Sequence, residues 1–156
     1  PELAGMMEFI MAGPMDRHCS QLFEKTPSRI ITHLGMLSYD KSKKLMQTAH
    51  ILVSIDMHIP DIRKAVFFPS KLLDYFLAQR RILAVTSKDS TTAEVLKHQQ
   101  ATIVVHDDVK AMEDFFKQSL NAFDKHDATY FIARNIPAEF NAREQAGKLK
   151  LLIDRL

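Results

Sequence analysis

The chain has 156 residues, of which 46% are hydrophobic, enough to bury the core of one domain. Charged residues make up 26% of the chain and the formal net charge is +2, which argues against a disordered segment and against a nucleic-acid-binding domain. The single cysteine, Cys19, cannot form an internal disulfide, and no apolar run is long enough to span a bilayer, so we expect a cytoplasmic protein.

Short apolar runs alternate with helical patterns along the chain. Residues 6–12 form an apolar run that Gly13-Pro14 ends, which predicts a buried strand, and Asp16 then opens a helical pattern that Pro27 stops. The same patterns predict further strands at 30–34, 51–55, 82–85 and 102–105, and further helices at 38–49, 70–79, 91–99 and 109–121. This alternation predicts an α/β fold with a Rossmann-like, doubly wound parallel sheet of five strands.

The tail differs, because residues 128–136 and 138–156 are predicted to be helical with no strand after them. Apolar residues at helical spacing form a stripe on the second of these helices: Ala142, Ala146, Leu149, Leu152 and Ile153. We expect this terminal helix to pack across the domain or against a neighbour.

No repeat and no Gly/Ser-rich linker divides the sequence, which predicts a single domain over residues 1–156. Because the chain begins at Pro1 without a signal segment, we interpret it as a piece of a longer protein.

Ligands of an open parallel sheet bind beyond the carboxyl ends of the strands. The loops at that edge are expected to begin at Gly13, Gly35, Asp56, Thr86 and His106. Ser70 is predicted to cap the helix after the third of these loops, where free backbone N–H groups would attract a phosphate and Lys71 would add positive charge. The alternative is that Ser70 only caps the helix and that Lys71 is solvated.

Three segments together resemble a known family. PSKLLDYFLAQRRILAVT, from Pro69 to Thr86, is similar to the signature of the C-terminal domain of GT-B-fold glycosyltransferases of family 4. ITHLGMLSYDKSKKLMQTAHILVSID upstream, at 31–56, and STTAEVLKHQQATIVVHDDVKAMEDFF downstream, at 90–116, resemble the flanking strands and helices of that domain in order and spacing. The resemblance covers roughly residues 7–116. It implies a nucleotide-sugar-binding half of a two-domain enzyme whose N-terminal acceptor domain is absent.

The resemblance also implies roles for particular residues. An acidic residue at the position of Asp74 binds the ribose hydroxyls in this family, and a carboxylate can accept from two vicinal hydroxyls. The segment with Phe68, Ser70 and Lys71 would contact the diphosphate. Lys71 and Asp56 are the polar groups expected nearest to the donor sugar.

Two glycine turns complete the donor site that the resemblance implies. Gly35 and Met36 would lie against the base, and at Gly13 the backbone would pass close to the substrate, although a simple tight turn also explains this glycine. The reaction implied is hexosyl transfer with retention of configuration, without a metal and without a cofactor. The nucleotide base, the donor sugar and the acceptor are not specified by these motifs.

The sequence departs from the family at three places. Val66 replaces the first glutamate of the family pair, and Gln79-Arg80-Arg81 replaces the customary Gly-x-Pro. The basic residues that commonly hold the diphosphate would lie upstream of Pro1. We therefore expect the isolated domain to be inactive, with the acceptor site and any general base supplied by the missing domain.

Two alternatives remain. One is another GT-B enzyme that uses a sugar nucleotide, such as an epimerase or a hydrolase, because fold alone does not separate these activities. The other is a non-catalytic binding module of flavodoxin or receiver type, although no acidic pair and no Ser/Thr/Gly-rich phosphate loop follows the first strand.

The histidines are scattered without ligand spacing, so no metal site is predicted. Family members that act on lipid-linked acceptors sit at membranes, which keeps a place at the membrane periphery open.

Overall fold

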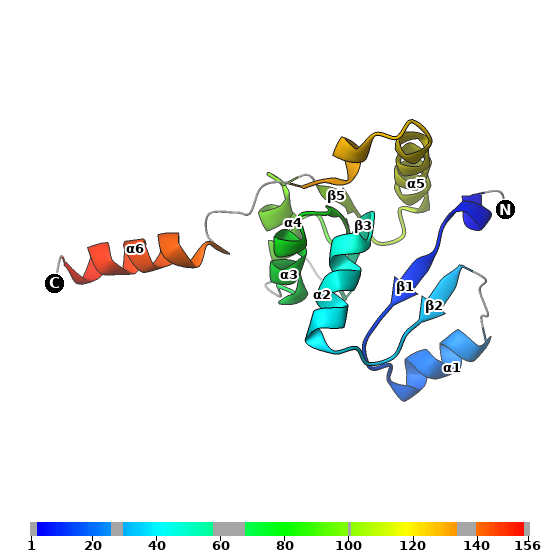
Figure 1. The fold of residues 1–156 in the computed structure, drawn as a ribbon, viewed down its shortest axis with the longest axis horizontal. Helices are drawn as coiled ribbons and strands as arrows, with labels where there is room; N and C mark the ends of the chain where they lie inside the picture. The colour runs from blue at the N-terminus through cyan, green and yellow to red at the C-terminus, as the bar shows by residue number, and fades with distance from the viewer. Residues whose placement is uncertain (1–2, 26–29, 58–67, 100, 134–139, 155–156) are drawn as a thin grey trace. The chain divides into compact units, whose positions relative to one another are not determined.

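The computed structural model describes residues 3–25, 30–57, 68–99, 101–133 and 140–154. The chain falls into two compact units, Pro1–Leu45 and Met46–Leu156, each described here by itself (Figure 1). Val66 and residues 134–139, which the sequence analysis considered, lie outside the described residues.

The first unit is a small parallel α/β arrangement. It contains the 3-10 helix η1 (Leu3–Met6), β1 (Phe9–Met11), α1 (Arg17–Lys25), β2 (Ile31–His33) and the start of α2 (Tyr39–Thr48). β1 and β2 pair in parallel, from Phe9 opposite Ile31 to Met11 opposite His33. The α1 helix begins where the sequence predicts, because the Asp16 carboxylate accepts a hydrogen bond from the Cys19 backbone N–H at 2.7 Å.

The second unit contains a three-stranded parallel sheet in the order β3-β4-β5. Its elements are β3 (Ile51–Ile55), α3 (Lys71–Ala78), β4 (Arg81–Val85), α4 (Thr91–Leu96), β5 (Ala101–Val104), α5 (Val109–Asp124), η2 (Ala128–Phe131) and α6 (Ala142–Ile153). The register runs without interruption from Ile51 opposite Arg81 to Ile55 opposite Val85. The predicted α/β class with parallel strands is therefore confirmed, and each strand lies within two residues of its predicted start except β1.

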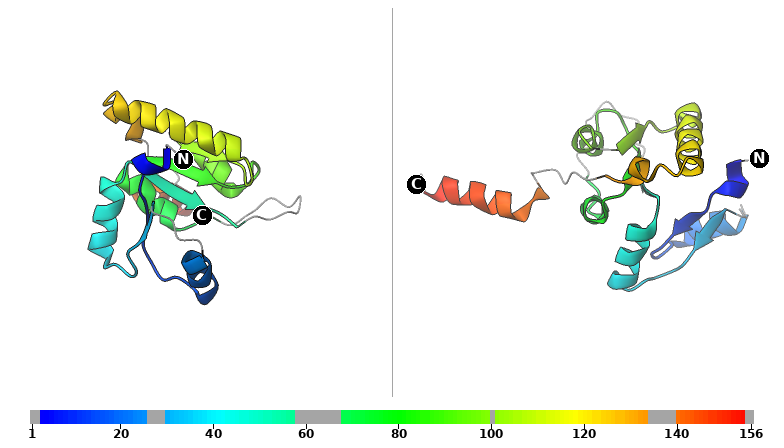
Figure 2. Two further views of the ribbon diagram at one scale, coloured as in Figure 1. Left: turned by 90° about the vertical axis from the view of Figure 1, so that its right-hand side faces the viewer. Right: turned by 45° about the horizontal axis from the view of Figure 1, so that its top comes forward.

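The central strand β4 is buried on both faces. On one face Ile82 and Ala84 pack against Leu72 and Phe76 of α3 and against Leu96 of α4. α3 and α4 therefore cover the same side of the sheet, and α5 covers the other (Figures 1 and 2). This explains why the 82–85 run is continuously apolar, since alternate side chains meet different helices.

The opposite face of β4 is covered by α5. Leu83 packs there with Val104 of β5 and Phe115 of α5, and each of the three side chains is at most 3% exposed. Phe116 and Met112 add partly buried contacts from the same helix. A three-layer arrangement of helix, sheet and helix results, as expected of a Rossmann-like unit.

The number of sheets differs from the prediction. The sequence predicted one sheet of five strands, whereas the described strands form one sheet of two and one of three. The strand at 6–12 is also shorter than predicted and not buried, with Ile10 40% and Met11 37% exposed. Apolar runs indicate which segments are extended, but strand pairing and burial depend on neighbours that are distant in sequence.

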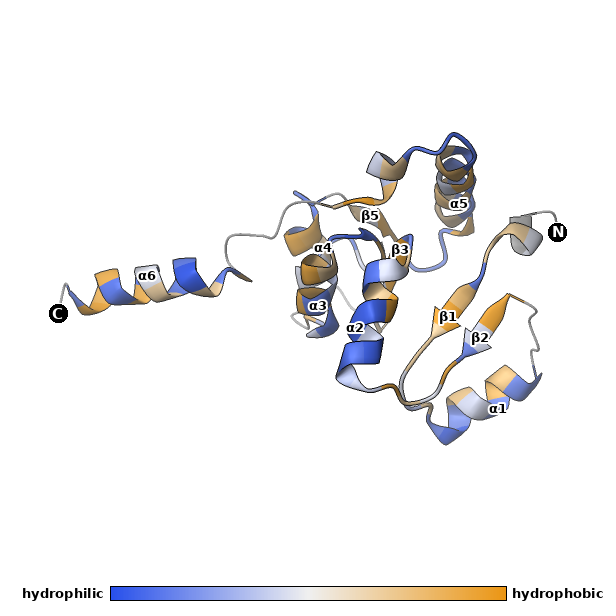
Figure 3. Ribbon diagram, in the orientation of Figure 1, coloured by the Kyte–Doolittle hydropathy of each residue, from blue (hydrophilic) through white to orange (hydrophobic). Residues whose placement is uncertain are grey.

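The tail is only partly as predicted. The first predicted helix is a single 3-10 turn, after which Ile132 pairs with Arg80 in an antiparallel bridge. The second is the helix α6, but all its residues are exposed, including Leu149 at 57% and Leu152 at 60%. Figure 3 shows hydrophobic and hydrophilic residues alternating along it. The predicted packing of its apolar stripe across the domain is therefore not observed, and packing against a neighbour remains a prediction. None of the helices in the described ranges combines the length and the apolar character needed to cross a bilayer.

We expect Leu83→Ala to lower the free energy of unfolding by about 2–5 kcal/mol, because it leaves a cavity between β4, β5 and α5. The measurement is urea unfolding followed by circular dichroism. Leu149→Ala is the matched control and should change stability by less than about 0.5 kcal/mol, because that side chain is exposed. Equal effects of the two substitutions would contradict the assigned core.

Candidate functional site

The carboxyl edge of the β3-β4-β5 sheet gathers polar residues from adjacent strand ends. Beyond the last ladder residues, the Asp56 N–H donates to the Val85 carbonyl at 3.0 Å and the Thr86 N–H donates to the Val104 carbonyl at 2.9 Å. Asp56 and Thr86 therefore continue the strands by one residue, and their side chains lie at the same edge.

A chain of hydrogen bonds links three of these side chains. The Thr86 hydroxyl donates to Asp56 Oδ2 at 2.7 Å and also bonds the Ser90 hydroxyl at 2.8 Å. Because Thr86 has one hydroxyl proton and gives it to the carboxylate, Ser90 must be the donor in the second bond. Ser90 Oγ in turn accepts from the Ala93 N–H at 3.0 Å and so caps α4. Thr86 and Ser90 are each 1% exposed, so this chain is held inside the protein.

Asp56 is fixed by further contacts but keeps one acceptor unused. The Asp56 carbonyl oxygen accepts a hydrogen bond from His106 Nε2 at 2.8 Å. Because a carbonyl oxygen can only accept, Nε2 of His106 carries a proton. The second carboxylate oxygen of Asp56, Oδ1, is buried and has no hydrogen-bond partner among the described residues. An oriented carboxylate with one unused oxygen can accept a hydrogen bond from a ligand hydroxyl.

Lys71 is the first residue of α3, and the Asp56 carboxylate affects its pKa. Loss of hydration around its ammonium group lowers the pKa of Lys71, and attraction to the Asp56 carboxylate partly offsets that lowering of the pKa. Lys71 as a whole is an exposed residue. The edge thus combines a carboxylate with a nearby cation.

Ser70 does not cap α3, and this prediction was wrong. Its backbone is helical, with φ −57° and ψ −27°, and its side chain makes no capping hydrogen bond. A capping serine usually needs an extended backbone to turn its hydroxyl toward the following N–H groups. Instead the Leu72 N–H donates to the Pro69 carbonyl at 3.0 Å and the Leu73 N–H donates to the Ser70 carbonyl at 3.1 Å. Two N–H groups that we expected to be free for a phosphate are therefore engaged in the turn.

The other predicted residues of this segment have different surroundings. Phe68 packs against the hydrophobic cluster of α3 and β4 and stacks on Phe140 with ring centroids 5.2 Å apart. Asp74 is half-buried and lies three residues after Lys71, so both lie on one side of α3. The structure brings Asp56 and Lys71 close enough to interact, and the ligand contacts predicted for Phe68, Ser70 and Asp74 remain predictions.

Tyr75 was not predicted from the sequence as a residue of this site. Its hydroxyl donates to the Val53 carbonyl at 3.0 Å, and burial raises the pKa of this tyrosine. The bond attaches α3 to β3 and so fixes the helix that carries Lys71 and Asp74. An aromatic residue on a helix gives no sequence signal for such a bond, whereas Ser90 could have been found as a serine directly before a helical run.

Gly13, Gly35 and Met36 belong to the first unit. The Gly13 N–H donates to the Gly35 carbonyl at 2.8 Å, and His33 Nε2 donates to the Gly13 carbonyl at 2.9 Å. Both glycines have positive φ, 125° and 66°, which explains why glycine stands at these turns. Met36 is 74% exposed. The structure thus joins the two glycine turns at the carboxyl ends of β1 and β2.

Within the described ranges, no group of three or more His, Cys, Asp or Glu residues is placed to hold a metal ion. No protein-family model, curated protein or solved structure matches this chain. The chemistry of the carboxyl edge therefore rests on its own residues.

We expect Thr86→Val to destabilise the second unit by about 1–3 kcal/mol, because the isosteric change leaves Asp56 Oδ2 and Ser90 without their shared partner. Urea unfolding measures the change. Thr129→Val removes an exposed hydroxyl that bonds the Asp127 carboxylate, and it should cost about 0.5–1 kcal/mol, less than Thr86→Val, because both groups of that bond are exposed to water. A Thr86→Val protein as stable as this control would contradict the buried hydrogen-bond chain.

Competitive acetylation across a pH series should show that the pKa of Lys71 lies below the ordinary lysine value of about 10.4. Asp56→Asn should lower the pKa of Lys71 further, because it removes the negative charge that favours the ammonium form. Lys110 provides an internal reference, since its hydrogen bond to Asp114 raises the pKa of that lysine. An unchanged or higher pKa of Lys71 in Asp56→Asn would mean that the two groups do not interact.

Proposed function

We propose that this chain is the donor-binding half of a two-domain, retaining glycosyltransferase and that it binds a nucleoside-diphosphate sugar at the carboxyl edge of the β3-β4-β5 sheet. The observation that carries the proposal is the Asp56 carboxylate held by Thr86 at that edge, where α3 begins with Lys71. The resemblance of Pro69–Thr86 to the family 4 signature supports the same assignment.

The chemistry of glycosyl transfer explains why these groups are suitable. As the bond from the sugar to the diphosphate breaks, negative charge grows on the leaving diphosphate and must be stabilised. A partly desolvated ammonium group attracts that charge more strongly than a fully hydrated one. Lys71 would therefore contact the diphosphate, without a metal ion in the proposed mechanism.

Two carboxylates would bind the hydroxyl groups of the donor. Asp56 is oriented by Thr86, and its buried oxygen Oδ1, which has no hydrogen-bond partner among the described residues, would have to become accessible to accept from a hydroxyl of the sugar. Asp74, on the same side of α3 as Lys71, would accept from the vicinal ribose hydroxyls. The acceptor and any general base would belong to the second domain of the proposed enzyme.

A receiver-like binding module is the second candidate, and one observation favours it. Asp56 and Thr86 stand at the ends of adjacent parallel strands and share a hydrogen bond. A carboxylate in that position can take up a phosphoryl group from a small acyl phosphate, with a carboxylate leaving group. Incorporation of phosphate from acetyl phosphate that Asp56→Asn abolishes would favour this candidate over the donor domain.

The test of the proposed function is calorimetric titration of the chain with UDP, GDP, ADP and CMP. We expect one diphosphate to bind and Lys71→Gln to weaken it about tenfold, because one charge-assisted hydrogen bond is lost. Asp74→Ala should also weaken binding of that nucleotide. Asp124→Ala, an exposed position at the end of α5, is the matched control for Asp74→Ala and should have no effect.

Absence of binding by all four nucleotides at millimolar concentration, in the chain and in the full-length protein, would overturn the assignment. The full-length protein also separates the related activities of the same architecture. Release of nucleoside diphosphate without a glycosylated product would indicate a hydrolase or an epimerase in place of a transferase.

A further inference from the structure

A cavity of about 260 Å³ lies at the opposite, amino edge of the β3-β4-β5 sheet. His50 immediately precedes β3 and Arg80 immediately precedes β4, and both line the cavity. The strands are five residues long, so this edge is separated from Asp56 and Thr86 by about 16 Å at 3.3 Å per residue. The cavity is therefore distinct from the proposed donor site.

One wall of the cavity carries a positioned cation. Arg80 directs Nε and Nη2 to the same carbonyl oxygen, that of Gln47, with the Nε bond 2.8 Å long. These bonds use two of the guanidinium's five N–H donors and fix its plane, so the other donors remain for a ligand. A planar guanidinium fixed in this way suits the oxygens of a carboxylate or a phosphate.

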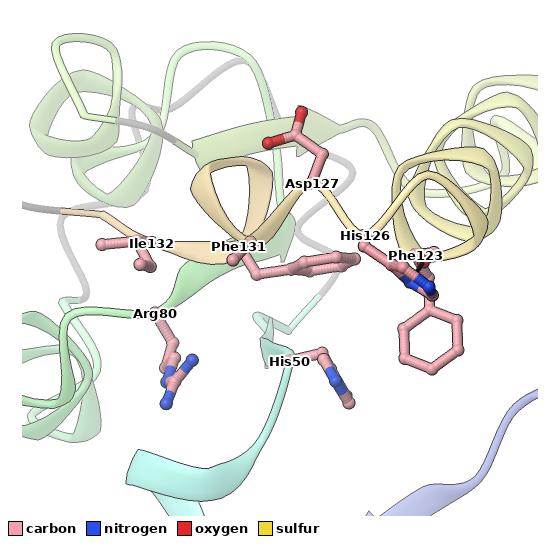
Figure 4. A pocket seen from close by; sticks show the side chains of 8 residues that line it. His50, Arg80, Phe123, His126, Asp127, Phe131 and Ile132 are labelled. Carbon is pink, nitrogen blue, oxygen red and sulfur yellow. Dashed lines mark hydrogen bonds between the residues drawn. The ribbon is translucent and has the colours of Figure 1, made fainter.

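Two histidines line the same cavity, and the carboxylate in the lining is directed away from Arg80 and His50 (Figure 4). His50 and His126 are exposed lining residues. His126 Nδ1 donates to the Phe123 carbonyl at 3.3 Å, so His126 would donate to an anion through Nε2 in its protonated form. The Asp127 carboxylate accepts hydrogen bonds from the Thr129 N–H and hydroxyl and from the Tyr130 N–H. Figure 4 shows it pointing away from Arg80 and His50. The groups that face the cavity thus favour a negative ligand.

The remaining lining is apolar and partly aromatic. His50 packs edge-on against Phe123 and Phe131, with ring centroids 5.3 Å and 5.2 Å apart. Phe123 is 52% exposed, and Ile132 completes the apolar wall. Aromatic edges and faces of this kind favour a flat ring. The volume lies below the usual 300–1,000 Å³ of a drug-sized site, so it suits a single ring with one anionic group.

We propose that this cavity binds a small organic anion, with its carboxylate or phosphate on Arg80 and the histidines and its apolar ring against Phe123, Phe131 and Ile132. Such a site lies at the opposite edge of the sheet from the proposed donor site. The proposal does not depend on the glycosyltransferase assignment.

The experiment is calorimetric titration of the chain with phenyl phosphate, inorganic phosphate and benzyl alcohol. We expect phenyl phosphate to bind most tightly, because it supplies both the anion and the ring. Arg80→Gln should weaken it about tenfold or more. Phe123→Ala should weaken phenyl phosphate but leave inorganic phosphate unchanged.

Three controls make the outcome decisive. Arg143→Gln removes the same charge from the exposed helix α6 and should leave binding unchanged. Thermal unfolding checks that Arg80→Gln remains folded, and His126→Gln, at an exposed position, serves as a second lining variant that should also weaken binding. Phenyl phosphate that binds no better than inorganic phosphate, or a loss of binding in Arg143→Gln as large as that in Arg80→Gln, would overturn the proposal.

Discussion

Burial of β4 on both faces is the constraint on which the second unit depends. Ile82 and Ala84 require cover from α3 and α4, and Leu83 requires cover from α5. β4 is also the central strand, with β3 and β5 paired on its two sides. The three-layer arrangement follows from the apolar character of one five-residue segment together with parallel pairing.

The same parallel sheet places polar side chains at its two opposite edges. Because all three strands run in the same direction, Asp56 and Thr86 follow the carboxyl ends, while His50 and Arg80 precede the amino ends. The carboxyl edge is organised by a buried hydrogen-bond chain around one carboxylate. The amino edge is organised by a guanidinium bonded to a carbonyl oxygen and by aromatic rings. The two edges therefore differ in the ligands that they favour.

α3 connects the fold to the proposed function. Its apolar residues Leu72 and Phe76 are buried in the core, and Tyr75 bonds the neighbouring strand. These contacts fix the rotation of the helix, so that Lys71 stays at the surface beside the carboxyl edge. A single helix thus supplies both core packing and polar groups at the carboxyl edge.

The sequence alone determined the order of strands and helices in the second unit, because burial on both faces and helical spacing leave local patterns that need no knowledge of neighbours. It also located the edge where Asp56 and Thr86 lie, since that edge follows from parallel pairing. Only the tertiary structure decided that the strands form two sheets, that Ser70 does not cap α3 and that Thr86 and Ser90 hold Asp56. The physical reason is that strand pairing, backbone angles at a helix start and buried hydrogen bonds depend on residues brought together from distant parts of the chain.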